Sequence, residues 1–117
     1  MNSDAVLEGL LSFAEDDWLP LWVIVQDVEE LLEIDEPEEI LEATISLAKG
    51  LLKHGLLAGD SPAHAAIHFR AWPNQDPDFV ADYIRSEWRR RSGLPSWGDG
   101  PWFAPRRYPR NLADFHV

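Results

Sequence analysis

Carboxylates recur four residues apart at two places in the first half of the chain, as Glu29/Glu33 and Glu38/Glu42. On a helix this spacing places both side chains on one face, where they could hold a metal ion or act as an acid–base pair. Such chemistry also needs a cleft, and the sequence pattern indicates none. We therefore interpret these pairs as an electrostatic surface and expect no catalytic residues.

A second four-residue spacing separates His64 from His68. Two histidines at this spacing on a helix, or on one face of a strand, are typical of a zinc pair. The chain has no cysteine, and only Asp60 or His54 is available as a third ligand. Because so short a motif is a weak signal, we expect two surface histidines, no metal site and no cofactor.

Motifs for a nucleophile or a nucleotide are missing from the sequence. None of the seven serines lies in a Gly-x-Ser-x-Gly turn, and there is no phosphate loop and no Gly-x-Gly-x-x-Gly run. With no cysteine, thiolate chemistry is excluded as well. We expect a protein that is not an enzyme.

Negative charge is concentrated in the first half of the chain. The formal net charge is −11; residues 1–60 hold 15 acidic and two basic residues, and residues 61–117 hold six acidic and eight basic ones. A surface of this sign repels phosphate backbones and speeds encounters with basic partners. Nucleic acid is therefore an unlikely partner, whereas a basic protein is a good one.

The arginines of the second half allow two interpretations. Arg85, Arg89, Arg90 and Arg91, with Arg106, Arg107 and Arg110, could form a basic patch for DNA. They could instead form internal salt bridges with the acidic half of the chain. We favour the salt bridges, because DNA binding by a winged helix needs a positive third helix and hairpin, and here the hairpin offers Arg70 alone.

Four helices are predicted, over residues 4–15, 21–32, 37–54 and 78–91. Leucine, isoleucine and valine recur in them at steps of three and four residues. Pro37 suits a first helical position, and Gly55 suits a left-handed cap after the third helix. In the fourth helix we expect five side chains to point inward: Phe79, Val80, Tyr83, Ile84 and Trp88.

A β-hairpin is predicted after the third helix. Residues 56–58 form a short apolar strand, residues 59–62 are typical of a turn, and residues 66–72 alternate with a period of two. Beyond Arg91 the chain is rich in glycine, proline and aromatic residues, and we expect Trp97, Trp102 and Phe103 to pack onto the rest. At this length we expect one domain, residues 1–117, with a core over about 4–103 and a C-terminal tail over 104–117.

The predicted fold is mostly α with a small β-hairpin. Its element order is winged-helix-like, with four helices and an aromatic, proline-rich tail; the alternative is a helical bundle with an irregular hairpin. In a winged helix the third helix commonly reads DNA. Here that helix begins with Glu38, Glu39 and Glu42, opposed by Lys49 and Lys53 alone.

Five segments together resemble one group of proteins: residues 18–21 (WLPL), 51–60 (LLKHGLLAGD), 69–72 (FRAW), 84–88 (IRSEW) and 94–103 (LPSWGDGPWF). They span most of residues 18–103 and resemble the small acidic immunity-type proteins encoded beside bacterial polymorphic toxins. The resemblance implies a protein that neutralises one cognate toxin, often a basic nuclease or deaminase, by covering its active site.

Charge and resemblance favour a non-enzymatic, protein-binding inhibitor, most simply an immunity protein whose partner is a toxin with a basic active-site surface. The alternative is a winged-helix transcriptional regulator. No apolar run reaches membrane-spanning length, and the N-terminal residues lack the regions of a signal peptide. We expect a cytoplasmic protein with no membrane partner. The predicted partner-binding residues are Asp27, Glu30, Glu33, Asp35, Glu36, Glu38, Glu39 and Glu42.

Overall fold

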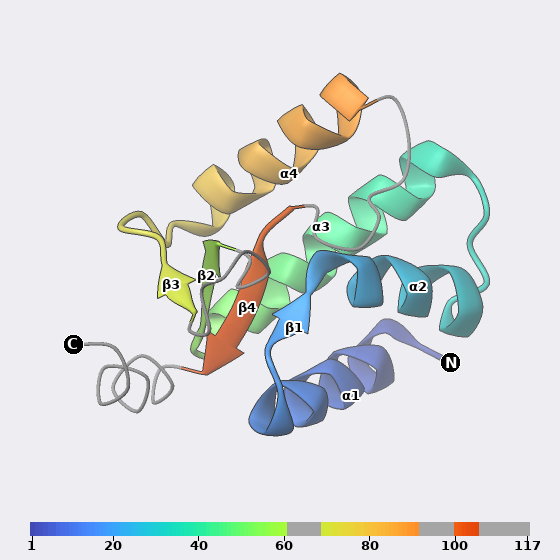
Figure 1. Ribbon diagram of the computed structural model, residues 1–117. Coiled ribbons are helices and arrows are strands. Elements are labelled where there is room, and N and C mark those ends of the chain that lie inside the picture. The colour runs from blue at the N-terminus through green and yellow to red at the C-terminus, as the bar shows by residue number, and fades with distance from the viewer. Residues whose placement is uncertain (61–68, 92–99, 106–117) are drawn as a thin grey trace.

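Four helices make up most of the computed structural model, which describes residues 1–60, 69–91 and 100–105 (Figure 1). They are α1 (Ser3–Asp16), α2 (Leu21–Leu31), α3 (Pro37–Lys53) and α4 (Pro77–Arg91). Each lies within one or two residues of a helix predicted from the apolar spacing. The mostly helical prediction is therefore confirmed.

Helix α3 is central, since it packs against α1, α2, α4 and strand β2 (Leu56–Asp60). Pro37 is its first residue, and the backbone after it turns at Gly55 with a φ of +96°. A left-handed φ is open to glycine at little cost, so the predicted cap is confirmed. Its buried residues are Ile40, Leu41, Thr44, Ile45, Leu47, Ala48 and Leu51.

The sheet has four antiparallel strands in the order β1-β4-β2-β3. Besides β2 they are β1 (Leu19–Pro20), β3 (Arg70–Ala71) and β4 (Trp102–Pro105). The predicted hairpin pairs β2 with β3, where Gly59 lies opposite Ala71. The predicted turn over residues 59–62 is wrong at Gly59 and Asp60, which belong to β2, and of the predicted strand over 66–72 the described residues show Arg70–Ala71 alone. A Cβ on Gly59 would collide with the carbonyl oxygen of Arg70 and the ring of Phe69, so this pairing requires glycine.

Strands β1 and β4 extend the sheet beyond the predicted hairpin. The sequence offered no sign of β1, because a two-residue Leu-Pro strand has no periodicity to detect. Strand β4 lies between β1 and β2, with Phe103 opposite both Leu19 and Ala58. It runs to Pro105, two residues into the segment expected as a tail; Trp97 lies outside the described residues.

Side chains alternate across β4, as they must in a strand. Phe103 is fully buried in the main core cluster with residues of all four helices. Trp102 and Ala104 belong to a second, smaller cluster with Phe69, against which Trp18 and Leu57 pack. The expectation that Trp102 and Phe103 pack onto the rest of the protein is confirmed.

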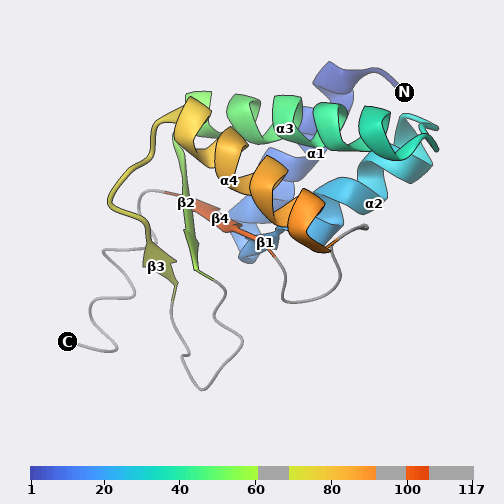
Figure 2. The same cartoon turned by 90° about the horizontal axis from the view of Figure 1, so that it is seen from above.

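Helices α3 and α4 run side by side, with the sheet below them in Figure 2. Val80, Ile84 and Trp88 face the core as predicted, but Phe79 and Tyr83 do not; they are 42% and 39% exposed. That part of the prediction is wrong. The spacing of apolar residues does not show how much of the helix surface its neighbours will bury. Here the buried strip includes Val80, Ile84 and Trp88 and leaves out Phe79 and Tyr83.

No helix in the described parts of the chain combines the length and the apolar character needed to cross a membrane.

Candidate functional site

The predicted partner-binding residues all come from the end of α2, the 32–36 connection and the first two turns of α3. We call this surface the acidic face. The connection lies at one end of the molecule, at the right of Figure 1. Seven of its eight carboxylates are exposed and Asp27 is half-buried. The acidic face comprises Asp27, Glu30, Glu33, Asp35, Glu36, Glu38, Glu39 and Glu42.

Burial affects one member of the acidic face. The pKa of Asp27 is raised above its ordinary value, first by burial and second by the neighbouring charge of Glu30. Glu30 itself accepts a long hydrogen bond of 3.5 Å from Nε2 of Gln26. Ionised Asp27 therefore lowers the stability of the folded protein.

Backbone conformation sets Glu33 apart. It has a φ of +55°, the only positive φ at a non-glycine residue in the described chain. The backbone N–H of Leu32 donates to the Asp27 carbonyl and that of Ile34 to the Val28 carbonyl, so the chain reverses direction around Glu33. Glycine or asparagine normally occupies such a position. The 32–36 connection contains neither, so the left-handed residue could not be predicted from the residue types.

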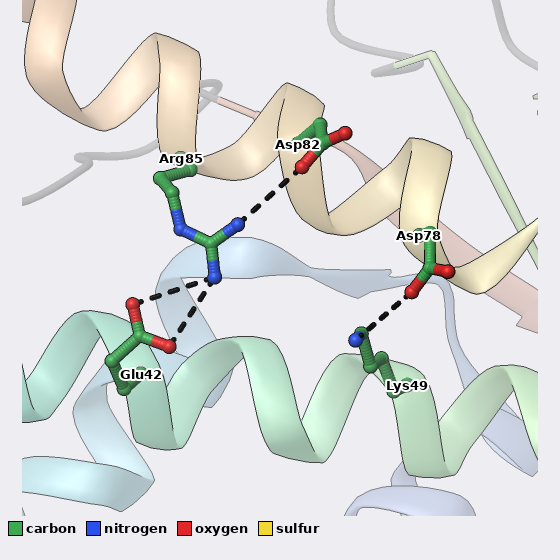
Figure 3. A network of polar contacts seen from close by, with 5 residues as sticks. All are labelled: Glu42, Lys49, Asp78, Asp82 and Arg85. Atoms are coloured by element: carbon green, nitrogen blue, oxygen red, sulfur yellow. Dashed lines mark hydrogen bonds and ion pairs between the residues drawn. The ribbon is translucent and has the colours of Figure 1, made fainter.

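Glu42 differs from the other members because α4 supplies it with a cation. Nη2 of Arg85 lies 3.3 Å and 3.4 Å from the two carboxylate oxygens of Glu42. Nη1 of the same arginine lies 3.4 Å from Asp82 (Figure 3). Two turns further along α3, Lys49 reaches Asp78 at 3.1 Å. We call these five residues the α3–α4 seam.

The other carboxylates of α3 and the connection have no such partner. Glu33, Asp35, Glu36, Glu38 and Glu39 form no ion pair with another described residue. From Met1 to Ala48 the chain contains no lysine, arginine or histidine at all. Apart from Glu42, the acidic face is thus a run of carboxylates that no cation among the described residues neutralises.

The prediction of salt bridges to the acidic half is confirmed for one of the described arginines, Arg85. Arg85 links α4 to the acidic half, while Arg90 pairs with Glu87 on its own helix at 2.7 Å. Arg89 is exposed. The side chains of Arg91, Arg106, Arg107 and Arg110 lie outside the described residues.

Residues 1–60, 69–91 and 100–105 contain no set of side chains suited to bind a metal ion. No group of three histidine, aspartate or glutamate side chains there could hold an ion. His64 and His68 lie outside these ranges. In the acidic pair Glu38/Glu42, the Glu42 carboxylate already has Arg85 as its ion-pair partner and is not left for a shared metal ion.

The structure also contains an apolar hollow that the sequence did not reveal. Its cavity measures about 340 Å³, and its lining is almost wholly apolar. The Trp72 ring lies 4.7 Å from that of Tyr83 at 57°, and 6.1 Å from that of Phe79 at 86°. We call it the aromatic hollow; it is lined by Trp72, Pro73, Asn74, Phe79 and Tyr83.

Gln75 fixes the loop that carries this hollow. Its side-chain amide donates to the carbonyls of Ala58 and Trp72, both at 2.8 Å, and its Oε1 accepts from the Ala58 N–H at 2.7 Å. The indole N–H of Trp72 donates to Asp60 at 2.8 Å. In the sequence, the one sign of the hollow was the spacing of Phe79 and Tyr83, four residues apart. That spacing fits a buried helix face equally well.

Comparison with known proteins returned no match: no family model, no curated protein and no solved structure is similar to this chain.

Proposed function

We propose that this chain is a non-enzymatic inhibitor that binds a basic protein through the acidic face. The most specific form of the proposal is an immunity protein that neutralises a cognate bacterial toxin in the cytoplasm. The observation that carries it is a continuous surface of exposed carboxylates for which the described chain supplies no cation except at Glu42.

Two structural penalties within the acidic face support this proposal. Glu33 holds a left-handed backbone where glycine or asparagine would be easier, and Asp27 is kept where burial disfavours its charge. A single substitution is usually enough to relieve such strain. A charged residue that is kept in a strained position is therefore a reason to infer a role in binding. In this interpretation the carboxylates are kept for a partner, at some loss of stability.

A toxin that acts on nucleic acid has the complementary surface. Such an enzyme needs a positive groove to hold phosphates. A rigid, negatively charged face can occupy that groove, and opposite charges speed the encounter. The partner class we propose is therefore a toxin with a basic active-site surface.

The test is to measure the affinity of this protein for the product of the gene next to its own. We expect changing Asp35, Glu38 and Glu39 to lysine to weaken binding at least ~100-fold, since charge reversals at an interface each remove an attraction and add a repulsion. The matched control reverses Glu8, Glu15 and Asp16, which are exposed on α1. Equal losses from both triple variants, or none from the first, would exclude the acidic face as the contact.

The second candidate function is a winged-helix regulator. What favours it is the order of elements, with the β2–β3 hairpin directly after α3. Against it, Glu38 and Glu39 are exposed on the first turn of α3, and the described part of the hairpin adds Arg70 alone as a cation. A gel-shift with random duplex DNA at low salt separates the two, because DNA binding is strongest there.

A further inference from the structure

We infer that the aromatic hollow receives a proline-rich, extended segment of a partner protein. This inference goes beyond the proposed function, because it concerns a different surface and a different kind of recognition. The hollow lies between α4 and the loop after β3, whereas the acidic face lies at the α2–α3 connection. Neither depends on the other being correct.

The walls of the hollow fit a compact, apolar ring. The Trp72 and Phe79 rings stand at 86° with 6.1 Å between their centroids, so they form a corner rather than a stack. Tyr83 also interacts electrostatically with Arg90. We therefore assign the surface open to a ligand to Trp72, Pro73 and Phe79, of which Phe79 is 42% exposed. The cavity of about 340 Å³ lies within the size range of ligand pockets.

Charge around the hollow is balanced, in contrast to the acidic face. Residues 70–90 hold four acidic and four basic side chains, so their formal charge is zero. Asp60 accepts the indole N–H of Trp72 at 2.8 Å, and the exposed Arg70 lies opposite Asp60 in the pairing of β2 with β3. Three carboxylates already have cations as partners: Asp78 has Lys49, Asp82 has Arg85 and Glu87 has Arg90. Because neither sign is in excess, the occupant that complements the hollow is neutral.

A hydrogen-bond donor in the lining selects for proline among neutral occupants. Oδ1 of Asn74 accepts from the Asp76 N–H at 2.9 Å, which leaves the side-chain NH₂ group of Asn74 without a partner among the described residues. A proline-rich segment carries backbone carbonyls as acceptors and, at each proline, no N–H. It can therefore accept a hydrogen bond from Asn74 while its rings contact the aromatic walls, and it leaves no donor of its own unpaired against the apolar lining.

Both sides of this contact are ordered in advance. Gln75 makes three hydrogen bonds that attach the loop to β2 and to the Trp72 backbone. A site whose walls are already fixed loses less conformational entropy when a ligand enters. A proline-rich segment also has little freedom to lose, because the pyrrolidine ring fixes φ. The cost of ordering is therefore low for a proline-rich ligand and higher for a flexible one.

The experiment is a titration of the full-length, ¹⁵N-labelled protein, followed at the Trp72 indole N–H, whose signal a Trp72→Phe variant identifies. The probes are acetyl-hexaproline amide and, at equal length, acetyl-Leu-Gly-Leu-Gly-Leu-Gly amide, which is apolar but keeps its backbone N–H groups. We expect a saturable shift with hexaproline, with a dissociation constant of about 1 mM or lower, and binding at least ~10-fold weaker with the leucine peptide. Equal shifts with both probes, or none with either, would overturn the inference.

Variants assign the effect to the hollow and to its donor. Asn74→Asp keeps an oxygen for the Asp76 N–H but replaces the donor with a second oxygen, so it should weaken hexaproline binding about tenfold. Phe79→Leu removes one aromatic wall and should weaken binding about fivefold. Phe13→Leu is the matched control, because Phe13 is 40% exposed on α1 and is not a lining residue. If Asn74→Asp binds as the unchanged protein does, or Phe13→Leu weakens binding as much as Phe79→Leu, the inference is wrong.

Two other occupants are tested by the same signal in the free protein. If the Trp72 resonance moves on dilution, a second copy of this chain fills the hollow. If it moves when Pro95 and Pro109 are changed to alanine in the full chain, a proline of the chain itself fills it. Either result would overturn binding of a partner's proline-rich segment, and an unmoved resonance in both experiments supports it.

Discussion

Two successive turns of α3 carry glutamates, but their surroundings differ. Toward α4, Glu42 pairs with Arg85 and Lys49 pairs with Asp78. At the start of the helix, Glu38 and Glu39 are exposed and form no ion pair with another described residue. Glu42 thus links two helices, while Glu38 and Glu39, about one turn earlier, have no ion-pair partner in the described chain. Charge therefore joins two helices at the α3–α4 seam, whereas on the acidic face it is left for the external partner that we propose.

Breaking the α3–α4 seam should have the largest effect on stability. Arg85→Glu removes two ion pairs and places a third carboxylate beside Glu42 and Asp82. Because Arg85 is only 30% exposed, we expect a loss of about 1–2 kcal/mol in the free energy of unfolding. Urea unfolding measures it. Arg89→Glu, at an exposed position of the same helix, should cost less than half as much; an equal loss would mean that the seam contributes nothing specific.

Removing the backbone strain at Glu33 should raise the free energy of unfolding, the opposite of breaking the seam. Glu33→Gly removes the penalty of a left-handed φ, and we expect unfolding to become more difficult by about 1 kcal/mol. Asp35→Asn removes the same charge at a neighbouring residue without a positive φ and should change stability little. If Glu33→Gly destabilises the protein, strain at Glu33 is not a feature of the acidic face. If the proposed function is correct, Glu33→Gly should also bind the basic partner protein more weakly.

Salt should separate the two surfaces further. Screening weakens attraction at the seam and repulsion on the acidic face, and the unpaired carboxylates are more numerous. We expect sodium chloride to raise the free energy of unfolding, by less than about 1 kcal/mol. Changing Glu36, Glu38 and Glu39 to glutamine should reduce this gain. A protein that loses stability in salt would show that the seam, not the acidic face, dominates its electrostatics.

Asp27 gives the smallest and most pH-dependent difference. Because its pKa is raised in the folded state, the folded protein holds this proton to higher pH than the unfolded chain does. Stability therefore falls as pH rises through that window, and the penalty is complete above the folded pKa. Asp27→Asn should stabilise the protein by about 0.5 kcal/mol or less at neutral pH. The gain should vanish below the ordinary pKa of aspartate, as thermal unfolding across pH would show; a gain that persists in acid would not come from ionisation.

Local sequence signals were enough to predict the helices. Apolar spacing placed α1, α2, α3 and α4, and Pro37 and Gly55 marked the two ends of α3. These features depend on residues a few positions apart, so no knowledge of the rest of the chain is needed. The same holds for the acidic face, because carboxylates that follow one another in sequence across a short connection stay together in space.

Tertiary structure decided which of the equivalent residues play which role. Glu38 and Glu42 are alike in sequence, but only Glu42 faces Arg85, 43 positions along the chain. Phe79 and Val80 are both apolar, yet α3 covers only Val80, and Trp72 draws Phe79 and Tyr83 into the aromatic hollow. Strand β4 enters the sheet between β1 and β2, although its sequence lies beyond α4. The sequence by itself therefore determined the helices and the sign of the charge. Pairing, exposure and the hollow depended on contacts between distant segments, which no local pattern encodes.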